Sequence, residues 1–365
     1  MSELGPWEYI GIFVGTLTLS LILVPLALRF AVRREVLDHP GGYKGQAAPV
    51  PYLGGMAMLG AFTFTIGGAA LLRPPPSGLT DLLVMLGGAS LLALVGLIDD
   101  LRGLGITIRL AATVVAAVAL WFGGTGVLLF GDPWLDGGLT VLWVVGITNA
   151  LNLLDNMDGL SAGVAAIAAW TFFMVAALNG QYLVAGLSLA LAGCAAGFLR
   201  HNLPPAKIYM GDAGSLFLGF MLAALGIRLR LDQGPPIAVL VPILVLTVPL
   251  LDTGLVTISR LHRGVSPFQG SADHTSHRLV RTGMTVRGAV TVIYVAAIAS
   301  GWLAIVMSRQ TDAVSGYLLA ALWATMAAAG GWFLVRFTPE SHHEPPSSKR
   351  LDHGPASTSV HRTNP

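Results

Sequence analysis

Long apolar segments recur through most of this 365-residue chain, and they restrict its fold more than any other feature. A membrane-spanning helix needs ~20 mostly apolar residues. Only 11% of the residues are charged, against about 25% in soluble domains, which is too few to cover a soluble surface. We therefore predict an all-α, polytopic membrane protein, a bundle of about 11 transmembrane helices. The predicted helices are 8–32, 51–72, 79–98, 107–123, 139–154, 161–178, 181–199, 214–230, 236–258, 286–307 and 313–336.

The positions of the basic residues predict the orientation of these helices. If the chain starts outside and alternates through eleven helices, 17 of its 21 Lys and Arg residues fall inside. Cytoplasmic loops of membrane proteins carry such an excess, so we predict an outside N-terminus and a cytoplasmic C-terminus. Residues 1–337 form a single membrane-embedded domain in this prediction. Residues 338–365 are rich in Pro, Ser and His, and we expect them to be a disordered cytoplasmic tail.

Two acidic residues, Asp99 and Asp100, close the third predicted helix on the cytoplasmic side. Ionisable groups at such positions are costly and usually functional. Adjacent carboxylates repel each other, so the pair needs a cation or shares a proton. The alternative is a solvated helix end, at which Arg102 neutralises one carboxylate.

A second polar cluster lies between two uncharged apolar segments, 139–147 and 161–178. Asn149 and Asn152 are three residues apart and share one helix face, which Asp155 continues. Carboxylate and amide oxygens are the hard ligands that Mg²⁺ prefers. The alternative is a helix cap followed by a glycine turn. Capping needs one such residue, whereas this stretch has two Asp and three Asn.

The start of the eighth predicted helix has the composition of a phosphate-binding turn. Gly211, Gly214 and Ser215 are small residues that let backbone N–H groups approach an anion, and the helix dipole favours phosphate at that place. Asp212 in the same turn is a candidate ligand for a metal that bridges the phosphate. An ordinary N-cap at Asp212 is the alternative.

The loop from residue 259 to residue 285 is the longest polar stretch outside the tail, and it also falls on the cytoplasmic side. It carries His274, His277 and Arg278, which are residue types that suit phosphate binding. A solvated basic loop is the alternative. Lys44, in an earlier loop rich in Pro and Gly, is either a further phosphate contact or a surface lysine.

Carboxylates, amides, a glycine-rich helix start and a basic loop thus meet at one membrane boundary. Mg²⁺-assisted chemistry on a phosphate, with one partner carried by a lipid, fits this combination best. An ion-coupled transporter is the rival class. Transporters place such groups near the bilayer midplane and often in repeated halves, and no repeat is visible in this sequence.

These motifs resemble those of the polyprenyl-phosphate N-acetylhexosamine-1-phosphate transferases, a family that includes phospho-N-acetylmuramoyl-pentapeptide transferase. The match runs from about Asp38 to Arg287, in the family's order. The resemblance implies that a sugar phosphate passes from a UDP-sugar to a polyprenyl phosphate with release of UMP. Both direct attack by the lipid phosphate and a route through an aspartyl-phosphate are open. The matching motifs are Asp99-Asp100 and the stretches 149–160, 202–215 and 273–279.

The resemblance also implies a role for each matched residue. Asp212 looks like the principal Mg²⁺ ligand, helped by Asn152, with Mn²⁺ as an alternative ion. Asp99 is similar to the residue that deprotonates or positions the lipid phosphate. Tyr209 matches an aromatic residue that stacks on uracil, and Asn202 matches a polar contact to that base. The other matched catalytic residues are Asp100, Asp155, Asp158 (towards the uridine), His274 and His277, and the other substrate-binding residues are Lys44, Asn149, Gly211, Ser215 and Arg278.

Three positions depart from the family's pattern. Thr107, with Arg109 nearby, stands where the family often has a Lys, Ser276 replaces a His, and Gln46 replaces another His. The stretch 273–279 matches the loop that binds the sugar-diphosphate end. Its sequence is closer to the branch that uses UDP-N-acetylglucosamine than to the peptidoglycan branch.

The resemblance thus predicts transfer of N-acetylglucosamine-1-phosphate from UDP-N-acetylglucosamine to undecaprenyl or decaprenyl phosphate. A phospho-N-acetylmuramoyl-pentapeptide transferase is the alternative. The predicted location is the bacterial cytoplasmic membrane, with the active site on the cytoplasmic face. The expected partners are the two substrates and membrane lipids, no nucleic-acid partner is expected, and a homodimer is an open option.

Overall fold

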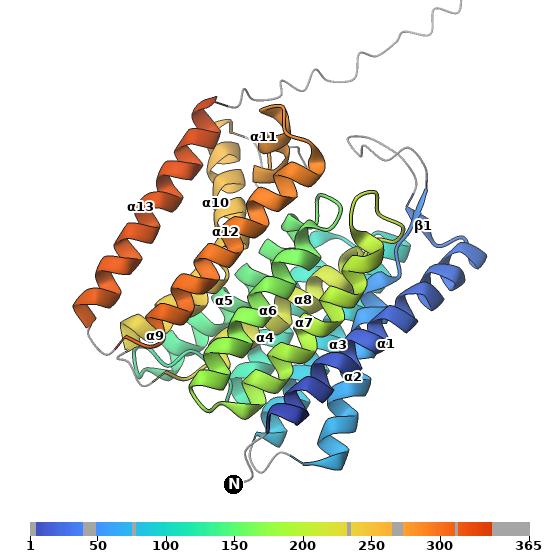
Figure 1. Ribbon diagram of the computed structural model, residues 1–365, viewed down its shortest axis with the longest axis horizontal. Coiled ribbons are helices and arrows are strands. Elements are labelled where there is room, and N and C mark those ends of the chain that lie inside the picture. The colour runs from blue at the N-terminus through green and yellow to red at the C-terminus, as the bar shows by residue number, and fades with distance from the viewer. Residues whose placement is uncertain are drawn as a thin grey trace, which may run out of the picture.

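The computed structural model describes residues 5–38, 49–74, 78–231, 235–264, 273–310 and 313–337, and this part of the chain is mainly helical. Thirteen helices and one short antiparallel strand pair are present in it, and the helices pack as a bundle (Figure 1). The elements are α1 (Pro6–Arg33), β1 (Leu37–Asp38), β2 (Val50–Pro51), α2 (Gly54–Leu72), α3 (Leu79–Arg102), α4 (Ile106–Phe122), α5 (Pro133–Leu154), α6 (Leu160–Leu178), α7 (Tyr182–Asn202), α8 (Gly211–Arg228), α9 (Pro235–Val245), α10 (Thr247–His262), α11 (Thr275–Arg281), α12 (Val286–Met307) and α13 (Ala313–Phe337).

The prediction of a polytopic, all-α membrane protein is confirmed. Within the described residues, nine helices are long and apolar enough to cross a bilayer, and α9 with α10 adds a tenth if this bent pair is one span. The remaining predicted span is α4, which has 17 residues. At 1.5 Å per residue it is about 25 Å long, a little shorter than the apolar layer of a typical bilayer.

The prediction of one continuous helix over 236–258 is wrong. The chain bends by 75° between α9 and α10. Pro249 follows the break and has no N–H to donate to the carbonyl oxygen of Val245, which removes one bond of a continuous helix. The Thr247 hydroxyl instead donates to the Leu244 carbonyl oxygen at 2.6 Å. Helix α10, which follows the bend, carries an acidic residue, Asp252, that is buried in the interior of the protein.

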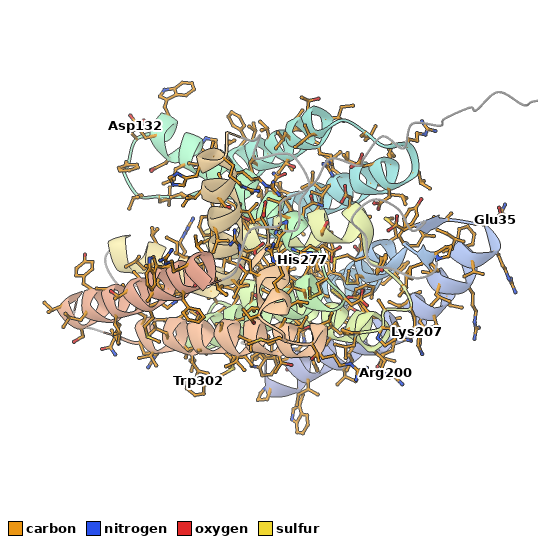
Figure 2. The ribbon with its side chains drawn as sticks, turned by 90° about the horizontal axis from the view of Figure 1, so that it is seen from above. Glu35, Asp132, Arg200, Lys207, His277 and Trp302 are labelled. Atoms are coloured by element: carbon orange, nitrogen blue, oxygen red, sulfur yellow. The ribbon has the colours of Figure 1, made fainter. Side chains whose placement is uncertain are left out.

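The bundle has one end at which the polar elements gather. In Figure 1, α11 and β1 lie at the upper end and α9 lies at the lower end. Figure 2 looks onto the upper end, and His277 of α11 lies near the middle of that view. We call this the motif end. The helices α3, α5, α7 and α10 finish there, and α4, α6 and α8 begin there.

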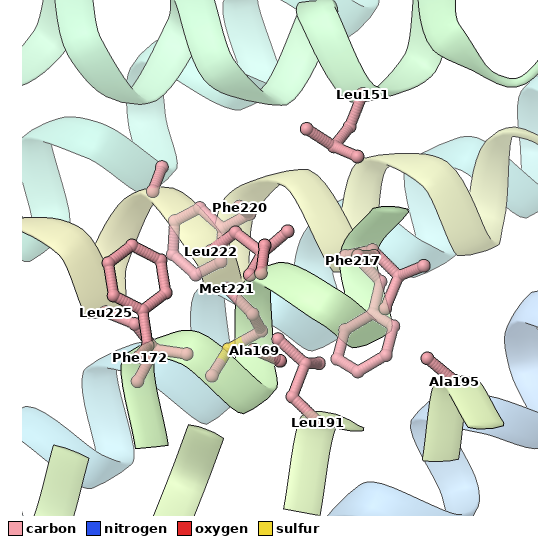
Figure 3. Packing of buried hydrophobic residues seen from close by; sticks show 14 of the residues in the cluster. Leu151, Ala169, Phe172, Leu191, Ala195, Phe217, Phe220, Met221, Leu222 and Leu225 are labelled. Atoms are coloured by element: carbon pink, nitrogen blue, oxygen red, sulfur yellow. The ribbon is translucent and has the colours of Figure 1, made fainter. Parts of the chain in front are cut away.

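Helix α8 forms the centre of the bundle, and every residue from Ala213 to Ile227 is buried. Figure 3 shows its Phe217 and Phe220 among apolar side chains of the surrounding helices, including Phe172 of α6 and Leu191 of α7. A helix that is apolar on all sides is suited to such a buried position. Because neighbours hold α8 on every side, its first turn is a fixed platform at the motif end.

Glycines let two helices, α2 and α3, pack closely against the first turn of α8. A Cβ atom on Gly96 of α3 would lie 2.4 Å from the backbone of Asp212 and Ala213, and one on Gly55 of α2 would lie 2.2 Å from Gly214 N. Any larger residue would push the helices apart. The glycines therefore allow the end of α3, with its two carboxylates, to reach the start of α8.

Candidate active site

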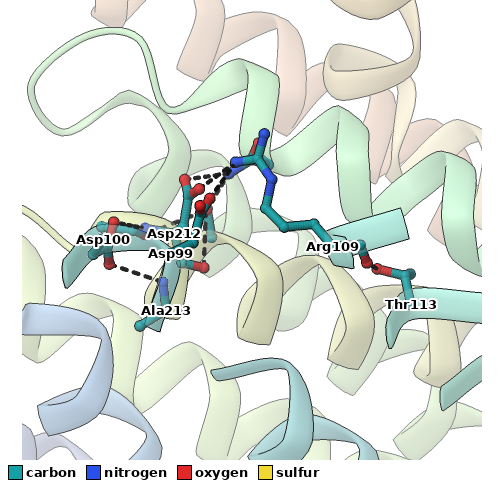
Figure 4. Close-up of polar contacts among 9 residues, drawn as sticks. Asp99, Asp100, Arg109, Thr113, Asp212 and Ala213 are labelled. Carbon is teal, nitrogen blue, oxygen red and sulfur yellow. Dashed lines mark hydrogen bonds and ion pairs between the residues drawn. The ribbon is translucent and has the colours of Figure 1, made fainter. Parts of the chain in front are cut away.

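Both oxygens of Asp100 cap the first turn of α8. Its Oδ1 accepts from the N–H of Asp212 at 2.9 Å, and its Oδ2 accepts from the N–H of Ala213 at 3.3 Å (Figure 4). The N-cap residue of α8, Met210, has no side chain suited to this task, so a carboxylate from α3 supplies it. Gly211 has a φ of 67°, and a Cβ there would lie 2.3 Å from Asp100 Oδ2. Asp100 thus holds the first turn of α8 in place by accepting hydrogen bonds from two of its backbone amides.

The neighbouring carboxylate, Asp99, faces a different set of groups. Arg109 of α4 forms an ion pair with Asp99 Oδ2 at 2.9 Å and a second, shorter ion pair with Asp212 Oδ2 (Figure 4). Its guanidinium therefore joins the third and eighth helices. The resemblance to the family placed Thr107 where the family often has a Lys, with Arg109 nearby. In the structure, Arg109 is the cation in the site.

Asn152 of α5 completes this group from the opposite side. Its amide nitrogen donates to Asp212 Oδ1 at 2.7 Å and to Ser215 Oγ at 2.9 Å. Asn152, Asp212, Ser215 and Asp99 therefore meet at the start of α8. The Asn149 amide donates instead to the Val145 carbonyl oxygen of its own helix at 2.8 Å.

The residues at the start of α8 fit a magnesium ion that is also held by its substrate. Among the described residues, no three His, Cys, Asp or Glu side chains are grouped closely enough to hold a metal by themselves. Mg²⁺ usually binds one or two carboxylates and takes further oxygens from water and substrate phosphates. Asp212 and the side-chain oxygen of Asn152 offer such a partial set.

Asp155 follows the last turn of α5 and lies near several other carboxylates. Burial raises the pKa of its carboxyl to about 8, and the nearby charges of Asp212, Asp100 and Asp158 contribute to this rise. With Asp99, the site has five carboxyl groups, and Arg109 lies between two of them, Asp99 and Asp212, so the site is net negative. Such a site favours the entry of a cation.

A second group of polar contacts holds the loop between α7 and α8. Asn202 Oδ1 accepts from Gly159 N at 3.0 Å, and its Nδ2 donates to the Ile208 carbonyl oxygen at 2.9 Å. Asp158 Oδ2 accepts from Ala206 N at 2.9 Å. Both predicted nucleotide contacts therefore bind backbone here, and together they fix the loop that carries Tyr209.

Tyr209 is half-buried beside these carboxylates. Burial raises the pKa of its phenol to about 12, and Asp158, Asp38 and Asp155 add to the effect. Its backbone is tied to the chain before α2, because its N–H donates to Pro51 O at 2.8 Å and its carbonyl oxygen accepts from Gly54 N at 3.0 Å. The phenol is therefore neutral, and the backbone that carries it is held in place.

The histidine segment lies beside the α5–α6 loop. Ser276 Oγ of α11 donates to Asn156 Oδ1 at 2.6 Å. The rings of His274 and His277 have centroids 6.4 Å apart. Burial lowers the pKa of the His277 imidazole, and the charges of His274 and Arg281 lower it further. Ser276, where the sequence departs from the family, thus connects α11 to the α5–α6 loop that carries Asp155 and Asp158.

The sequence prediction missed Asp252, a partner of His274. Its Oδ2 lies 2.8 Å from His274 Nδ1, and its Oδ1 accepts from Thr275 N at 2.7 Å. Both side chains are buried. A signal was present in the sequence, because Asp252 is the one acidic residue within the apolar segment 236–258, and such residues usually have a function.

Arg278 has a different environment from the one predicted for a substrate contact. Its side chain is fully buried, with Nε donating to Asp273 O at 2.9 Å and Nη2 donating to Ser259 Oγ at 3.1 Å. These bonds join the end of α10 to the start of α11. The predicted contact at Lys44 lies outside the described residues.

Comparison with known proteins gives a consistent picture of what this chain is similar to. Residues 82–230 match the sequence model of a family described as glycosyl transferase family 4. A Bacillus subtilis (strain 168) protein named as a probable undecaprenyl-phosphate N-acetylglucosaminyl 1-phosphate transferase is 31% identical over 84% of this chain and 87% of its own length.

Two further relatives have related names. A decaprenyl-phosphate N-acetylglucosaminephosphotransferase of Mycolicibacterium smegmatis is 33% identical over 72% of this chain and 73% of its own length. An undecaprenyl-phosphate alpha-N-acetylglucosaminyl 1-phosphate transferase of Escherichia coli O157:H7 is 28% identical over 80% of each chain. Residues 82–230, which match the family's sequence model, include Asp99 and Asp100, the α5–α6 loop and the start of α8.

Proposed function

Because the chain belongs to glycosyl transferase family 4, we propose that it transfers N-acetylglucosamine-1-phosphate from UDP-N-acetylglucosamine to a polyprenyl phosphate and releases UMP. The names of its relatives support the transferred group, N-acetylglucosamine phosphate, and this class of acceptor. The observation that carries the proposal is the meeting of Asp99, Arg109, Asn152 and Asp212 around the first turn of the central helix. This arrangement suits a diphosphate and a divalent cation, because it combines oxygen ligands with a fixed cationic side chain.

In the proposed reaction, an oxygen of the lipid phosphate forms a bond to the β-phosphorus of the UDP-sugar. The bond from that phosphorus to the bridging oxygen breaks, and UMP leaves with the electron pair. Asp99 orients the lipid phosphate and takes up its proton where one is present. Arg109 lies between Asp99 and Asp212 and balances charge on the reacting phosphates. Mg²⁺ at Asp212 and Asn152, when bound, would supply Lewis-acid stabilisation of the diphosphate oxygens.

The nucleotide end of the donor is assigned to the loop that carries Tyr209. The neutral phenol ring would stack on uracil, and Asp158 and Asn202 would act by holding the loop as well as by contact with the nucleoside. His274 and His277 would face the sugar-diphosphate end. These assignments predict that Tyr209→Ala raises the KM for the UDP-sugar more than it lowers kcat, because stacking serves binding of the ground state and transition state alike.

The experiment that tests the function is UMP release by the purified protein with polyprenyl phosphate, Mg²⁺ and a series of UDP-sugars. We expect release with UDP-N-acetylglucosamine. Release only with UDP-N-acetylmuramoyl-pentapeptide would assign the protein to the peptidoglycan branch. No release with any UDP-N-acetylhexosamine would refute the transferase proposal.

We further propose that the protein lies in the bacterial cytoplasmic membrane with its motif end in the cytoplasm. The bias of 17 inner basic residues out of 21 supports this orientation. Cys194 is buried and is the one cysteine of the chain, so single cysteines can be introduced for labelling. In intact cells, Lys207→Cys at the motif end should resist a membrane-impermeant maleimide, whereas Asp132→Cys at the other end should react. The reverse pattern would invert the orientation.

A further inference from the structure

Asp252 is an acidic residue in a position that needs an explanation. Its side chain is buried within an otherwise apolar segment, and only 2% of its surface is exposed. A carboxylate in a membrane helix is costly, and proteins retain such groups mainly where they have a function. The bend before α10 turns this part of the chain so that the carboxylate meets the start of α11.

The two carboxylate oxygens have separate partners at the start of α11, its N-cap residue His274 and its first residue Thr275. Oδ1 accepts from the backbone N–H of Thr275 at 2.7 Å, and Oδ2 lies 2.8 Å from Nδ1 of the His274 ring. The first contact fixes the backbone, and the second fixes the rotation of the imidazole. A carboxylate accepts but does not donate, so the Nδ1 atom of His274 must carry a proton. Within the described part of the chain, the other ring nitrogen, Nε2, forms no hydrogen bond.

The location of α11 gives this orientation a consequence for the reaction. Ser276 joins the helix to Asn156, the residue next to Asp155, at 2.6 Å. The ring of His277 lies 6.4 Å from the ring of His274. A histidine with a fixed Nδ1 proton therefore stands at the border of the carboxylate site, with Nε2 left for a ligand. Carboxylates behind histidines commonly set the tautomer and the ring orientation in this way.

We infer that Asp252 is a positioning residue for the transfer reaction, which acts by holding His274 with its Nε2 atom directed to the sugar-diphosphate. The inference rests on the proposed function for the identity of that ligand. The competing explanation is that Asp252 only fastens α10 to α11 through Thr275. The two explanations differ in their dependence on His274 and on the proton at Nδ1.

The variant that separates them is Asp252→Asn. The amide oxygen can still accept from Thr275 N, so the link between the helices is retained. The amide nitrogen would donate to His274 Nδ1, which moves the ring proton to Nε2. Loss of an orienting carboxylate behind a histidine costs about 10- to 100-fold, and we expect a loss of kcat/KM for UMP release in that range. Asp252→Glu keeps the carboxylate and should restore part of the activity.

A double-mutant cycle with His274→Gln measures whether Asp252 acts through the ring. We expect Asp252→Asn to change the rate by less than about twofold when His274 is already replaced. Equal losses in both backgrounds would overturn the inference. Asp136→Asn is the matched control, because Asp136 is also 2% exposed and accepts backbone N–H groups at the other end of the bundle. It should lower the unfolding temperature without changing kcat.

The second measurement does not depend on activity or on a variant of Asp252 that folds. In protein labelled with ¹⁵N-histidine, the His274 signal is identified by its absence from the His274→Gln spectrum. We expect a protonated Nδ1 in the unaltered protein. An unprotonated Nδ1 would overturn the inference even if the protein releases UMP, and a protonated Nδ1 would support it even if the donor differs.

Discussion

Binding of Mg²⁺ is expected to expel a proton from Asp155. Burial and the charges of Asp212, Asp100 and Asp158 hold the pKa of this carboxyl at about 8, well above the ordinary value of 3.8. A divalent cation beside Asp212 favours the ionised form of every nearby carboxylate and lowers their pKa values. The proton on Asp155 must then leave when the metal enters.

The pKa of Asp155 determines both how many protons Mg²⁺ binding releases and how that number changes with pH. With a pKa of about 8, roughly 0.9 of the Asp155 carboxyls are protonated at pH 7 and roughly 0.1 at pH 9. Asp155 should therefore contribute about 0.9 proton per bound Mg²⁺ at pH 7, provided the metal lowers the pKa well below 7. The contribution should fall to about 0.1 proton at pH 9 because the carboxyl is already ionised.

Isothermal titration calorimetry in two buffers of different ionisation enthalpy measures the number of protons released. The unaltered protein should release about 0.9 proton more than Asp155→Asn at pH 7, and the difference should nearly vanish at pH 9. Asp136→Asn, a buried carboxylate at the opposite end, should behave as the unaltered protein does. Equal proton release by Asp155→Asn and the unaltered protein at pH 7 would refute the reasoning.

Three further predictions concern the contacts around the first turn of α8. Asp212→Asn and Asp99→Asn should each lower the rate of UMP release at least about 100-fold while the protein still elutes as a folded species, and near-normal rates would contradict their assignment. Gly96→Ala should cost about 1–3 kcal/mol of unfolding free energy, because its Cβ would meet Asp212 and Ala213, and Gly87→Ala in the same helix is the control with open space around it. Arg109→Gln should increase the rise in unfolding temperature that Mg²⁺ produces, because it leaves Asp99 and Asp212 without their shared partner; an unchanged rise would mean that the ion binds elsewhere.

The sequence predicted the bundle well because each apolar segment carries its own signal. The eleven predicted segments follow the order of the long helices in the structure, with one failure at 236–258. That failure has a physical cause. Pro242 and Pro249 lie in an apolar run, and hydropathy does not distinguish a straight helix from a broken one. The backbone geometry that divides α9 from α10 depends on local hydrogen bonds such as the one from Thr247.

The sequence predicted which residues gather in the site, but not which of their side chains contact each other. Asp99, Asn152 and Asp212 were expected in one site, and the structure brings them together. The partners of Asp252 and Arg109 could not be read from the sequence, because each depends on helices that are distant along the chain. Asn202 shows the same effect, since a polar side chain expected to contact the base binds two backbone groups instead.

The contact between Asp100 and α8 has a consequence for genetic screens. Two adjacent aspartates at one helix end would both be scored as essential if every replacement inactivated the enzyme. Their phenotypes would nevertheless have different origins. Replacement of Asp100 removes the acceptors for two amides of the central helix, so we expect its first turn to shift. Asp99 accepts from neither amide, so we expect its replacement to leave that turn in place. Suppressor mutations should therefore arise for Asp100 in residues that pack against α8, and suppressors of that kind should not restore activity to Asp99 variants.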